Sequence, residues 1–318
     1  MSERAPGRAF TLMGVLNVTP DSFSDGGRFL DPGAAIGHGR ELLAQGADIL
    51  DVGGESTRPG AEPVTAAQEI ARIEPVVAGL SAAAGDAQIS IDTSKAVVAQ
   101  GAIDAGATLV NDVTAFRGDP AMAALVAERG VEVCLMHMLG EPRTMQREPR
   151  YEDVVSEVKA FLEERMRFAI AEGVAEERIM LDPGIGFGKT TEHNLELLRR
   201  LDELAALGRP LVIGTSRKTF LGRIAAAAAR RVAIAEVEPL PPDGRLPGTI
   251  ATNVLALERG ASVFRVHDVA AVRDALAVAA ATLGPQWPPS AAGTTAKSWT
   301  TTPARSTTRT TASRAPSR

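Results

Sequence analysis

The chain has 318 residues, of which 45% are hydrophobic and 23% charged, which is typical of a soluble globular protein. Its formal net charge is −5, but residues 284–318 contain five basic residues and no acidic ones, so residues 1–283 carry −10. An acidic body argues against a nucleic-acid enzyme. Residues 1–9 lack the apolar stretch of a signal peptide, and no segment is long enough to span a bilayer, so we expect a cytoplasmic protein without membrane contact.

The chain has one cysteine, Cys134, which excludes an internal disulfide framework and suits a reducing compartment. Cys134 lies in an apolar run that begins at Val131, and we expect a small core residue rather than a nucleophile. The four histidines form no zinc-ligand spacing.

Short runs rich in Val, Ile and Leu alternate along the chain with longer amphipathic stretches. We expect strands near residues 10–16, 47–51, 88–91, 107–111, 131–136, 178–182, 210–214 and 262–266. We expect helices near residues 33–45, 65–83, 95–104, 119–129, 152–172, 191–206, 248–259 and 268–281. Eight strand–helix units predict an α/β fold, a closed (β/α)8 TIM barrel. A doubly wound open sheet is the alternative, but no G-x-G-x-x-G follows the first strand.

The barrel is expected to occupy residues 10–283 as one domain, after a flexible N-terminus at residues 1–9. Residues 284–318 are rich in Thr, Ser, Pro and Ala without an apolar period, so we expect a disordered basic tail. Residues 224–247 are unusually rich in Ala and Pro, and we expect a helix from Lys218, an exposed loop and a main helix after Gly248. We expect this region to leave the motif residues untouched.

Residues 181–190 (LDPGIGFGKT) place Asp182 at a strand end, followed by three glycines and a lysine. Glycines let backbone N–H groups approach a ligand, and a helix N-terminus favours anions. Gly184 and Gly188 are one residue too close for the nucleotide-binding P-loop. The run alone leaves two interpretations open, a phosphate-binding turn and a plain strand–turn–helix connection.

Polar residues recur at the ends of the expected strands. Each alone is commonly a helix cap or a turn former. In a closed barrel, however, the loops that follow the strands gather at one face, where active sites lie. The polar strand-end residues are Asn17, Asp51, Asp92, Asn111, His137, Asp182, Ser216, Arg217, Lys218, Arg265 and His267.

Eight strings together resemble the dihydropteroate synthase family, from about Phe10 to Leu283. They are MGVLNVTPDSFSDGG (13–27), DVGGESTRPGA (51–61), SIDTSK (90–95), NDV (111–113), CLMHM (134–138), LDPGIGFGK (181–189), GTSRK (214–218) and RVHDV (265–269). The resemblance implies a transferase of folate biosynthesis that joins 4-aminobenzoate to 7,8-dihydropterin pyrophosphate and releases pyrophosphate. It also implies a (β/α)8 barrel, a Mg²⁺ requirement, sensitivity to sulfonamides and a homodimer.

The resemblance assigns the pterin ring to residues at four strand ends and one following helix. The Asp182 carboxylate would accept two adjacent N–H donors of the aminopyrimidine edge. Lys218 would contact the carbonyl side of the ring. The remaining pterin-binding residues are expected to be Asp92, Asn111 and Met136.

The diphosphate and the metal are assigned to a second group of residues. Asn17, Arg58, Arg265 and His267 are expected to bind the diphosphate, and Asn17 is also the expected metal-associated residue. One amide oxygen, diphosphate oxygens and water form a reasonable Mg²⁺ shell. Considered alone, His267 is more commonly a helix-start residue with a structural hydrogen bond.

The resemblance implies that the two long loops, residues 19–31 and 53–63, close over the substrates. Asp25 and Arg58 then join Lys218, Arg265 and His267 as catalytic residues. The leaving group is expected to depart before the amine attacks, without a covalent enzyme intermediate. The aminobenzoate pocket is expected to consist of Phe23, Thr57, Pro59, Phe187 and Thr219. Serine is common in the family where Thr219 stands, and this change could alter sulfonamide sensitivity.

Two rival functions share the pterin-side residues. One is a pterin-binding methyltransferase domain that serves a corrinoid partner, and the other is a catalytically silent pterin-binding paralogue. The strings DSFSDGG, GESTRPG, SRK and RVH favour diphosphate and aminobenzoate chemistry. A P-loop NTPase is a more distant rival, because the glycine spacing does not match.

Overall fold

The computed structural model describes residues 9–19, 31–56, 62–141 and 144–284. Within these ranges, eight parallel strands form one sheet in the order β6-β5-β4-β3-β2-β1-β8-β7. The strands are β1 (Thr11–Asn17), β2 (Ile49–Gly53), β3 (Gln88–Asp92), β4 (Leu109–Asp112), β5 (Glu132–Met136), β6 (Ile179–Asp182), β7 (Val212–Ile213) and β8 (Val263–Val266). A parallel bridge between Leu181 and Leu211 joins the two ends of this order, so the sheet closes into the expected barrel.

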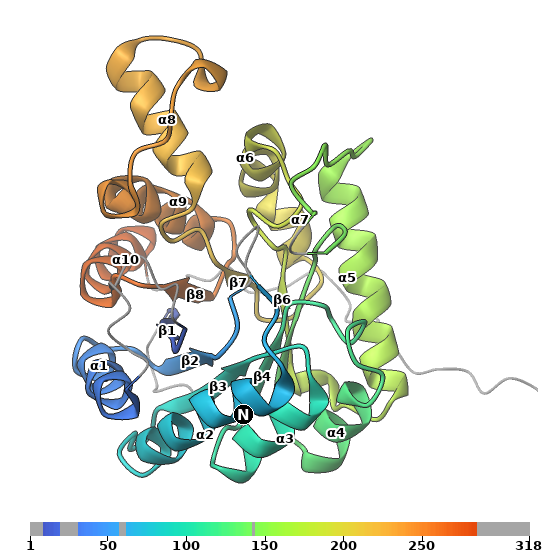
Figure 1. Cartoon of the computed structure of the whole chain (residues 1–318). Helices are drawn as coiled ribbons and strands as arrows, with labels where there is room; N and C mark the ends of the chain where they lie inside the picture. The colour runs from blue at the N-terminus through green and yellow to red at the C-terminus, as the bar shows by residue number, and fades with distance from the viewer. Residues whose placement is uncertain (1–8, 20–30, 57–61, 142–143, 285–318) are drawn as a thin grey trace, which may run out of the picture.

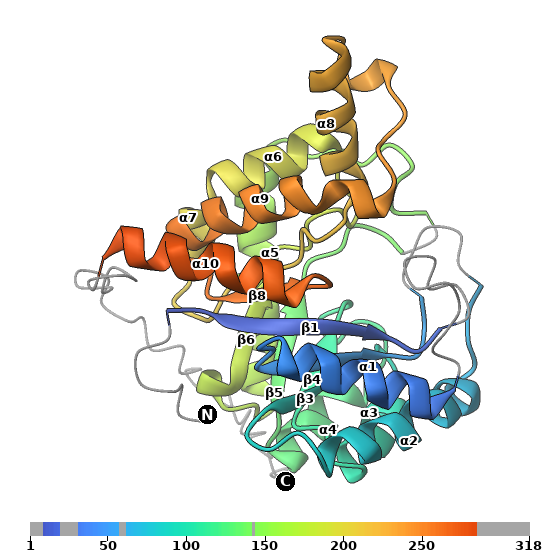
Figure 2. The ribbon, with the colours of Figure 1, turned by 90° about the vertical axis from the view of Figure 1, so that its left-hand side faces the viewer.

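Helices surround the strands (Figures 1 and 2). They are α1 (Pro32–Ala44), α2 (Ala66–Ser81), α3 (Ala96–Asp104), α4 (Met122–Arg129), α5 (Val154–Ala171), α6 (Thr191–Arg199), α7 (Leu201–Ala205), α8 (Thr219–Arg230), α9 (Leu246–Glu258) and α10 (Val269–Leu283). Three short 3₁₀ helices are η1 (Glu176–Arg178), η2 (Ile234–Glu236) and η3 (Pro242–Arg245). The alternation expected from the sequence is confirmed.

Two apolar cores hold the barrel together. The larger core contains apolar residues of the strands and of the helices around them, such as Leu12, Leu50 and Leu80. A second cluster draws its buried members from six different strands: Met13, Ile49, Leu109, Cys134, Val212 and Val263. Burial of Cys134 agrees with the expected core role, and burial raises the pKa of its thiol well above the usual range.

The main departures from the expected elements lie in the C-terminal half. The single helix expected at 191–206 is divided into α6 and α7 at Arg200, whose backbone leaves the helical conformation. Helix α8 projects from the barrel (Figure 1), and the residue that caps its C-terminus, Arg231, has the left-handed conformation with φ of 56°. The chain then returns through η2 and η3, where four prolines between residues 239 and 247 prevent a continuous helix. The helix–loop–helix organisation expected there is therefore observed.

Among the described residues, no helix is both long enough and apolar enough to cross a membrane. The residues described do not include 1–8 or 285–318, so the expectations for the N-terminus and the basic tail lie outside them.

Candidate active site

Three of the first four strands carry polar side chains at one level near their carboxyl ends. Asn17 of β1 pairs in register with Gly53 of β2, Gly53 with Asp92 of β3, and Asp92 with Asn111 of β4. A side chain at Gly53 would contact both the Asn17 amide oxygen and the Asp92 Cβ, each at 3.6 Å. The Asn17 and Asp92 side chains therefore flank Gly53 from its two neighbouring strands. Three of the predicted site residues thus come together.

Asp51 is the centre of a buried polar network just below this level. Its carboxylate is fully buried and accepts hydrogen bonds from Ser90 Oγ at 2.6 Å and Asn111 Nδ2 at 3.0 Å. It also accepts from Arg265 Nε at 2.6 Å. The strand-end position of Asp51 in the sequence predicted no specific role for it. It holds two predicted substrate-binding residues, Asn111 and Arg265, in place.

Arg265 connects two carboxylates. Its Nη2 donates to Asp92 Oδ2 at 2.7 Å while Nε binds Asp51. Burial favours the neutral guanidinium, but Asp51 and Asp92 outweigh it and raise the pKa of Arg265, so this side chain stays charged. Burial raises the pKa of Asp92 to about 7, and the Arg265 charge opposes that rise. The Arg265 cation therefore offsets part of the negative charge of these two buried acids.

Asp182 ends β6 on the other side of the barrel. Its Oδ1 accepts the backbone N–H of Gly184 at 2.7 Å, and its register partner on β5 is Met136. Burial raises the pKa of Asp182, while nearby Lys218 lowers it. Met136 belongs to a small apolar cluster with Val113, Met138 and Met145, against which Phe187 packs. A buried carboxylate therefore lies beside an apolar surface, which suits a flat polar ring.

Lys218 reaches from the turn before α8 toward the loop after β6. Its Nζ donates to the Ile185 carbonyl and lies 4.6 Å from the centre of the Phe187 ring. Burial lowers the pKa of Lys218 to about 7, although Asp182 favours the charged form. The structure thus brings Lys218, Phe187 and Asp182 together as expected. Thr219 is the first residue of α8 and is exposed.

The glycines of the loop after β6 have packing reasons. A Cβ on Gly184, whose φ is +65°, would lie 1.8 Å from the His137 carbonyl oxygen. A Cβ on Gly188 would lie 2.6 Å from the Leu139 carbonyl oxygen, and one on Gly186 would lie 2.9 Å from Lys218 Cδ. The loop is therefore pressed against the neighbouring loop and against Lys218. This packing accounts for all three glycines without a phosphate, as the plain-connection interpretation expects.

Lys189 is buried beneath this loop. Its Nζ lies 2.9 Å from His137 Nδ1 and donates to the Phe187 carbonyl at 3.0 Å. Burial lowers the pKa of Lys189 to about 7, and Lys218 lowers it further. Burial also lowers the pKa of His137 to about 2, so its ring is neutral. Neither residue has a role predicted from the sequence, because burial of a lysine in a glycine-rich loop has no sequence signature.

The loops after β7 and β8 are joined by two adjacent pairs of side chains. Ser216 Oγ lies 3.0 Å from His267 Nδ1 and accepts the His267 backbone N–H at 3.2 Å. Arg217 binds both oxygens of Asp268, at 3.0 and 2.6 Å. His267 therefore has the structural hydrogen bond expected of a helix-start residue, and it also lies beside the Lys218 turn. The structural hydrogen bond of His267 is compatible with its expected role in diphosphate binding.

Residues 224–247 do contact the motif residues, contrary to our expectation. Arg245 donates from Nη1 to the Arg217 carbonyl at 2.8 Å and from Nε to the Leu240 carbonyl at 2.7 Å. A Cβ on Gly222 would lie 2.8 Å from Arg245 Nε, so this glycine makes room for the contact. The expectation was wrong because the fold returns η3 to the base of α8, which the Pro-rich sequence does not reveal.

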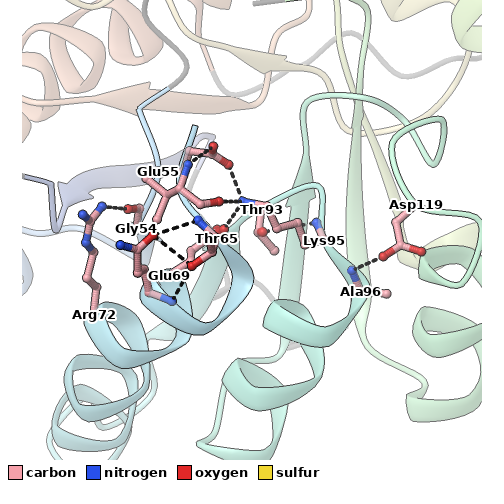
Figure 3. A network of polar contacts seen from close by, with 11 residues as sticks. Gly54, Glu55, Thr65, Glu69, Arg72, Thr93, Lys95, Ala96 and Asp119 are labelled. Atoms are coloured by element: carbon pink, nitrogen blue, oxygen red, sulfur yellow. Dashed lines mark hydrogen bonds and ion pairs between the residues drawn. The ribbon is translucent and has the colours of Figure 1, made fainter. Parts of the chain in front are cut away.

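Another polar network surrounds Lys95, the residue before α3 (Figure 3). Its Nζ donates to Glu55 and Glu69, both at 2.6 Å, and to the Val64 carbonyl at 2.9 Å. Glu55 in turn accepts the Val64 N–H at 3.0 Å. These contacts join the two described ends of the loop after β2 to the start of α3.

Five predicted site residues belong to the two long loops after β1 and β2. Phe23, Asp25, Thr57, Arg58 and Pro59 lie outside the described residues. Within the described part of the chain, no three His, Cys, Asp or Glu side chains form a cluster that could hold a metal ion.

Carboxylates, amides and cations gathered at one end of a (β/α)8 barrel define a barrel enzyme that binds a polar small molecule. The family model for pterin binding enzymes matches residues 13–267 of this chain. Dihydropteroate synthase of Mycobacterium leprae (strain TN) is 50% identical over 279 residues, which are 86% of this chain and 95% of that protein. The Escherichia coli K12 dihydropteroate synthase is 42% identical, over 86% of this chain and 91% of the other.

Solved structures of dihydropteroate synthases are similar to this chain in fold and in sequence. A Yersinia pestis dihydropteroate synthase with a sulfonamide drug complex has a TM-score of 0.80 at 40% identity, over 86% of this chain and 94% of that one. Xanthomonas albilineans dihydropteroate synthase in complex with 7,8-dihydropteroate has a TM-score of 0.75 at 40% identity, over 89% and 95%. The chain belongs to the dihydropteroate synthase family of pterin binding enzymes.

Proposed function

We propose that this protein is a transferase that condenses 6-hydroxymethyl-7,8-dihydropterin diphosphate with 4-aminobenzoate, to give 7,8-dihydropteroate and pyrophosphate. The observation that carries the proposal is the convergence of Asp92, Asn111, Asp182, Lys218 and Arg265 at one end of the barrel. Family membership supports it, since related enzymes have been solved with 7,8-dihydropteroate and with 4-aminobenzoic acid.

The pterin is proposed to lie over the Met136 cluster with its aminopyrimidine edge on Asp182. One oxygen of Asp182 already accepts the Gly184 N–H, and a carboxylate has about four lone-pair positions, so it can still accept two ring donors. Lys218 would donate to the ring carbonyl. Asp92 and Asn111 would contact the remaining polar atoms of the ring.

The diphosphate is proposed to lie toward Asn17, Arg265 and His267. Because Asp51 and Asp92 already bind Arg265, the guanidinium is held in one orientation before substrate arrives. His267 is oriented through the contact of its Nδ1 with Ser216 Oγ, which fixes the ring beside the turn before α8. Arg58 would add a second cation, as the family resemblance implies.

A Mg²⁺ requirement is a further proposal, and the residues present fit it. Mg²⁺ keeps several waters and is commonly held by one or two protein oxygens together with substrate phosphates. The Asn17 amide oxygen, near the Asp92 side chain across Gly53, is such a single protein oxygen. The ion would neutralise negative charge on the departing diphosphate.

The reaction breaks the bond between the pterin methylene carbon and the diphosphate oxygen and forms a bond from that carbon to the aminobenzoate nitrogen. We propose that departure precedes attack, because the electron-rich ring stabilises positive charge on the methylene. Arg265 and His267 stabilise the leaving diphosphate. The nitrogen then loses a proton to solvent, and no strong base is needed because an arylamine is already nucleophilic.

Aminobenzoate is proposed to stack beside Phe187 and Lys218, which lie together in the structure. Its carboxylate would meet the N-terminus of α8, where backbone N–H groups and the Thr219 hydroxyl can donate. Sulfonamides would compete for this position, and a Yersinia pestis dihydropteroate synthase has been solved with a sulfonamide drug. Phe23, Thr57, Pro59 and Asp25 keep their proposed roles from the resemblance.

The proposal is tested by steady-state release of pyrophosphate with each substrate alone and with both. We expect turnover only when both substrates and Mg²⁺ are present, with dihydropteroate formed in equal amount. Pterin binding without turnover would identify a silent paralogue. Methyl transfer from a methylated pterin to a corrinoid protein would identify the methyltransferase function. Either result overturns the proposal.

Homodimerisation and a cytoplasmic location are also proposed. The homodimer rests on the family resemblance, and the location rests on the single buried cysteine, which suits a reducing compartment. Sedimentation equilibrium should give twice the mass of one 33.2 kDa chain. A single-chain mass at micromolar concentration would contradict the dimer.

A further inference from the structure

The loop between β4 and α4 contains two consecutive residues whose backbone conformation is unfavourable for any residue with a side chain. Ala115 has φ of 51° and Phe116 has φ of 64°, both in the left-handed region. Residues other than glycine persist in this region only where the surrounding structure holds them there. Two such residues in succession indicate that the course of this loop is imposed by its contacts.

Two charged side chains hold the loop in this conformation. The buried carboxylate of Asp112, the last residue of β4, accepts the backbone N–H of Thr114 and that of Phe116, both at 2.8 Å. Arg165 of α5 donates from Nε to the Ala115 carbonyl at 2.8 Å. Each of the two left-handed residues is therefore tied down through its own backbone.

The next residue, Arg117, joins this loop to the loop after β5. Its Nε donates to the Thr114 carbonyl at 3.1 Å, and its Nη2 donates to the Met138 carbonyl at 2.9 Å. Its guanidinium also lies 4.8 Å from the centre of the Phe161 ring of α5. Because one guanidinium binds both carbonyls, Arg117 fixes the backbone of Met138 relative to the end of β4.

This contact lies beside the proposed pterin surface. Met138 and Val113 both belong to the apolar cluster that also contains Met136 and Met145. Val113 directly follows β4, whereas Met138 lies in the loop after β5. The Arg117 contact therefore holds together two parts of one apolar surface that come from different loops.

We propose that Arg117 is a positioning residue of the pterin pocket, which holds Met138 through its backbone carbonyl and so keeps the apolar cluster in the shape that receives the ring. This inference rests on the proposed function, because it assumes that the pterin lies over that cluster. The left-handed turn at Ala115 and Phe116 directs Arg117 toward the Met138 carbonyl. Arg117 acts through Met138 and does not itself need to contact the substrate.

The test compares Arg117→Leu with wild type in the binding of 6-hydroxymethyl-7,8-dihydropterin, measured by calorimetry. Without the two hydrogen bonds, the loop after β5 occupies its binding position for only part of the time. We expect the apparent Kd to rise about five- to tenfold, because a binding-competent state that is populated about 10–20% of the time weakens binding by that factor. KM for the pterin diphosphate should rise likewise, while kcat changes by less than about twofold.

The methionine methyl groups report on the apolar cluster directly. In nuclear magnetic resonance spectra of protein labelled at these methyl groups, the signals of Met136, Met138 and Met145 should shift in Arg117→Leu. Leucine is chosen because it adds no methionine signal. The signal of Met13, which belongs to the separate cluster inside the barrel, should stay in place.

Arg129→Leu is the matched control. Arg129 lies on α4, the helix that follows the same loop, and its guanidinium pairs with Asp104 at the surface. The variant removes an arginine whose partner is this carboxylate rather than the Met138 carbonyl. It should keep the wild-type Kd and the wild-type methionine signals.

The inference is overturned if Arg117→Leu binds the pterin with the wild-type Kd, even when the variant is less stable, because the residue then serves only the fold. A weaker Kd with the three cluster signals in place also overturns it, as does equal weakening in Arg129→Leu. Failure of the proposed function looks different, because wild type itself then lacks turnover with both substrates. The two failures are thereby distinguished.

Discussion

Arg265 and Asp51 lie 214 positions apart in the chain, and in the barrel Arg265 Nε donates to Asp51 Oδ2 at 2.6 Å. Strand β1 lies between β2 and β8, so the first and last parts of the barrel become neighbours. Asp51 also accepts from Ser90 and Asn111, which makes one buried carboxylate responsible for the geometry of a predicted pterin residue and a predicted diphosphate residue.

Asp51→Asn should destabilise the protein substantially. The substitution leaves the enclosed Arg265 guanidinium with one carboxylate in place of two, and breaking a buried ion pair costs about 3–5 kcal/mol. Urea unfolding measures the loss. Asp104→Asn is the control, because Asp104 pairs with Arg129 at the surface, with its side chain 53% exposed, and should cost less than about 1 kcal/mol. Equal effects of the two variants would contradict the structural role of Asp51.

Gly184→Ala should be far more harmful than Gly208→Ala. Both glycines have positive φ, +65° and +76°, so alanine is strained at both. A Cβ at Gly184 would also lie 1.8 Å from the His137 carbonyl oxygen, whereas one at Gly208 meets nothing within 4 Å. We expect Gly184→Ala to lose about 1–3 kcal/mol more on urea unfolding. Similar losses in both variants would show that the loop after β6 is not pressed against the loop after β5 as described.

Arg245→Met tests the contact between η3 and the Lys218 turn. The variant loses two charge-assisted hydrogen bonds, to the Arg217 and Leu240 carbonyls, each worth about 1.5–3 kcal/mol. We expect lower stability and a several-fold higher KM for aminobenzoate, because the turn before α8 is less firmly held. Arg259→Met removes an arginine that binds a carbonyl of its own helix, α9, and should leave KM unchanged. A wild-type KM in Arg245→Met would refute the coupling.

Stability should rise with pH above neutrality, partly because of Lys218. Its pKa falls from an ordinary 10.5 to about 7 on folding, so between these values the unfolded chain binds a proton that the folded chain does not. The unfolding free energy therefore increases with pH in this window, by up to about 1.4 kcal/mol per unit. Lys218→Met should show a smaller increase between pH 7 and pH 9 in urea unfolding. An unchanged slope would mean that the folded-state pKa of Lys218 is not lowered.

Much of the site could be predicted from sequence because its residues end strands. Asp92, Asn111 and Asp182 follow apolar runs directly, and a parallel barrel brings such positions to one face. The register pairs Asp92 with Asn111 as that reasoning requires. The repeated pattern of an apolar run followed by a polar residue was therefore sufficient to predict these site residues.

Contacts between distant segments could not be predicted in the same way. The Asp51–Arg265 pair depends on the order of strands around the barrel, and the burial of Lys189 depends on how one loop packs on another. The Arg245 contact was missed because the Pro-rich segment gives no periodic pattern that shows where it returns. These interactions are set by tertiary packing, which leaves no local signature.

The central claim is that Asp182 binds the pterin edge, and the most direct measurement is kcat/KM for the pterin diphosphate in Asp182→Asn. The amide has the size of the carboxylate but cannot accept two donors with both of its polar atoms. We predict a loss of about a hundredfold or more, with the variant still folded by circular dichroism. A folded variant that makes dihydropteroate with wild-type kcat/KM would contradict the account.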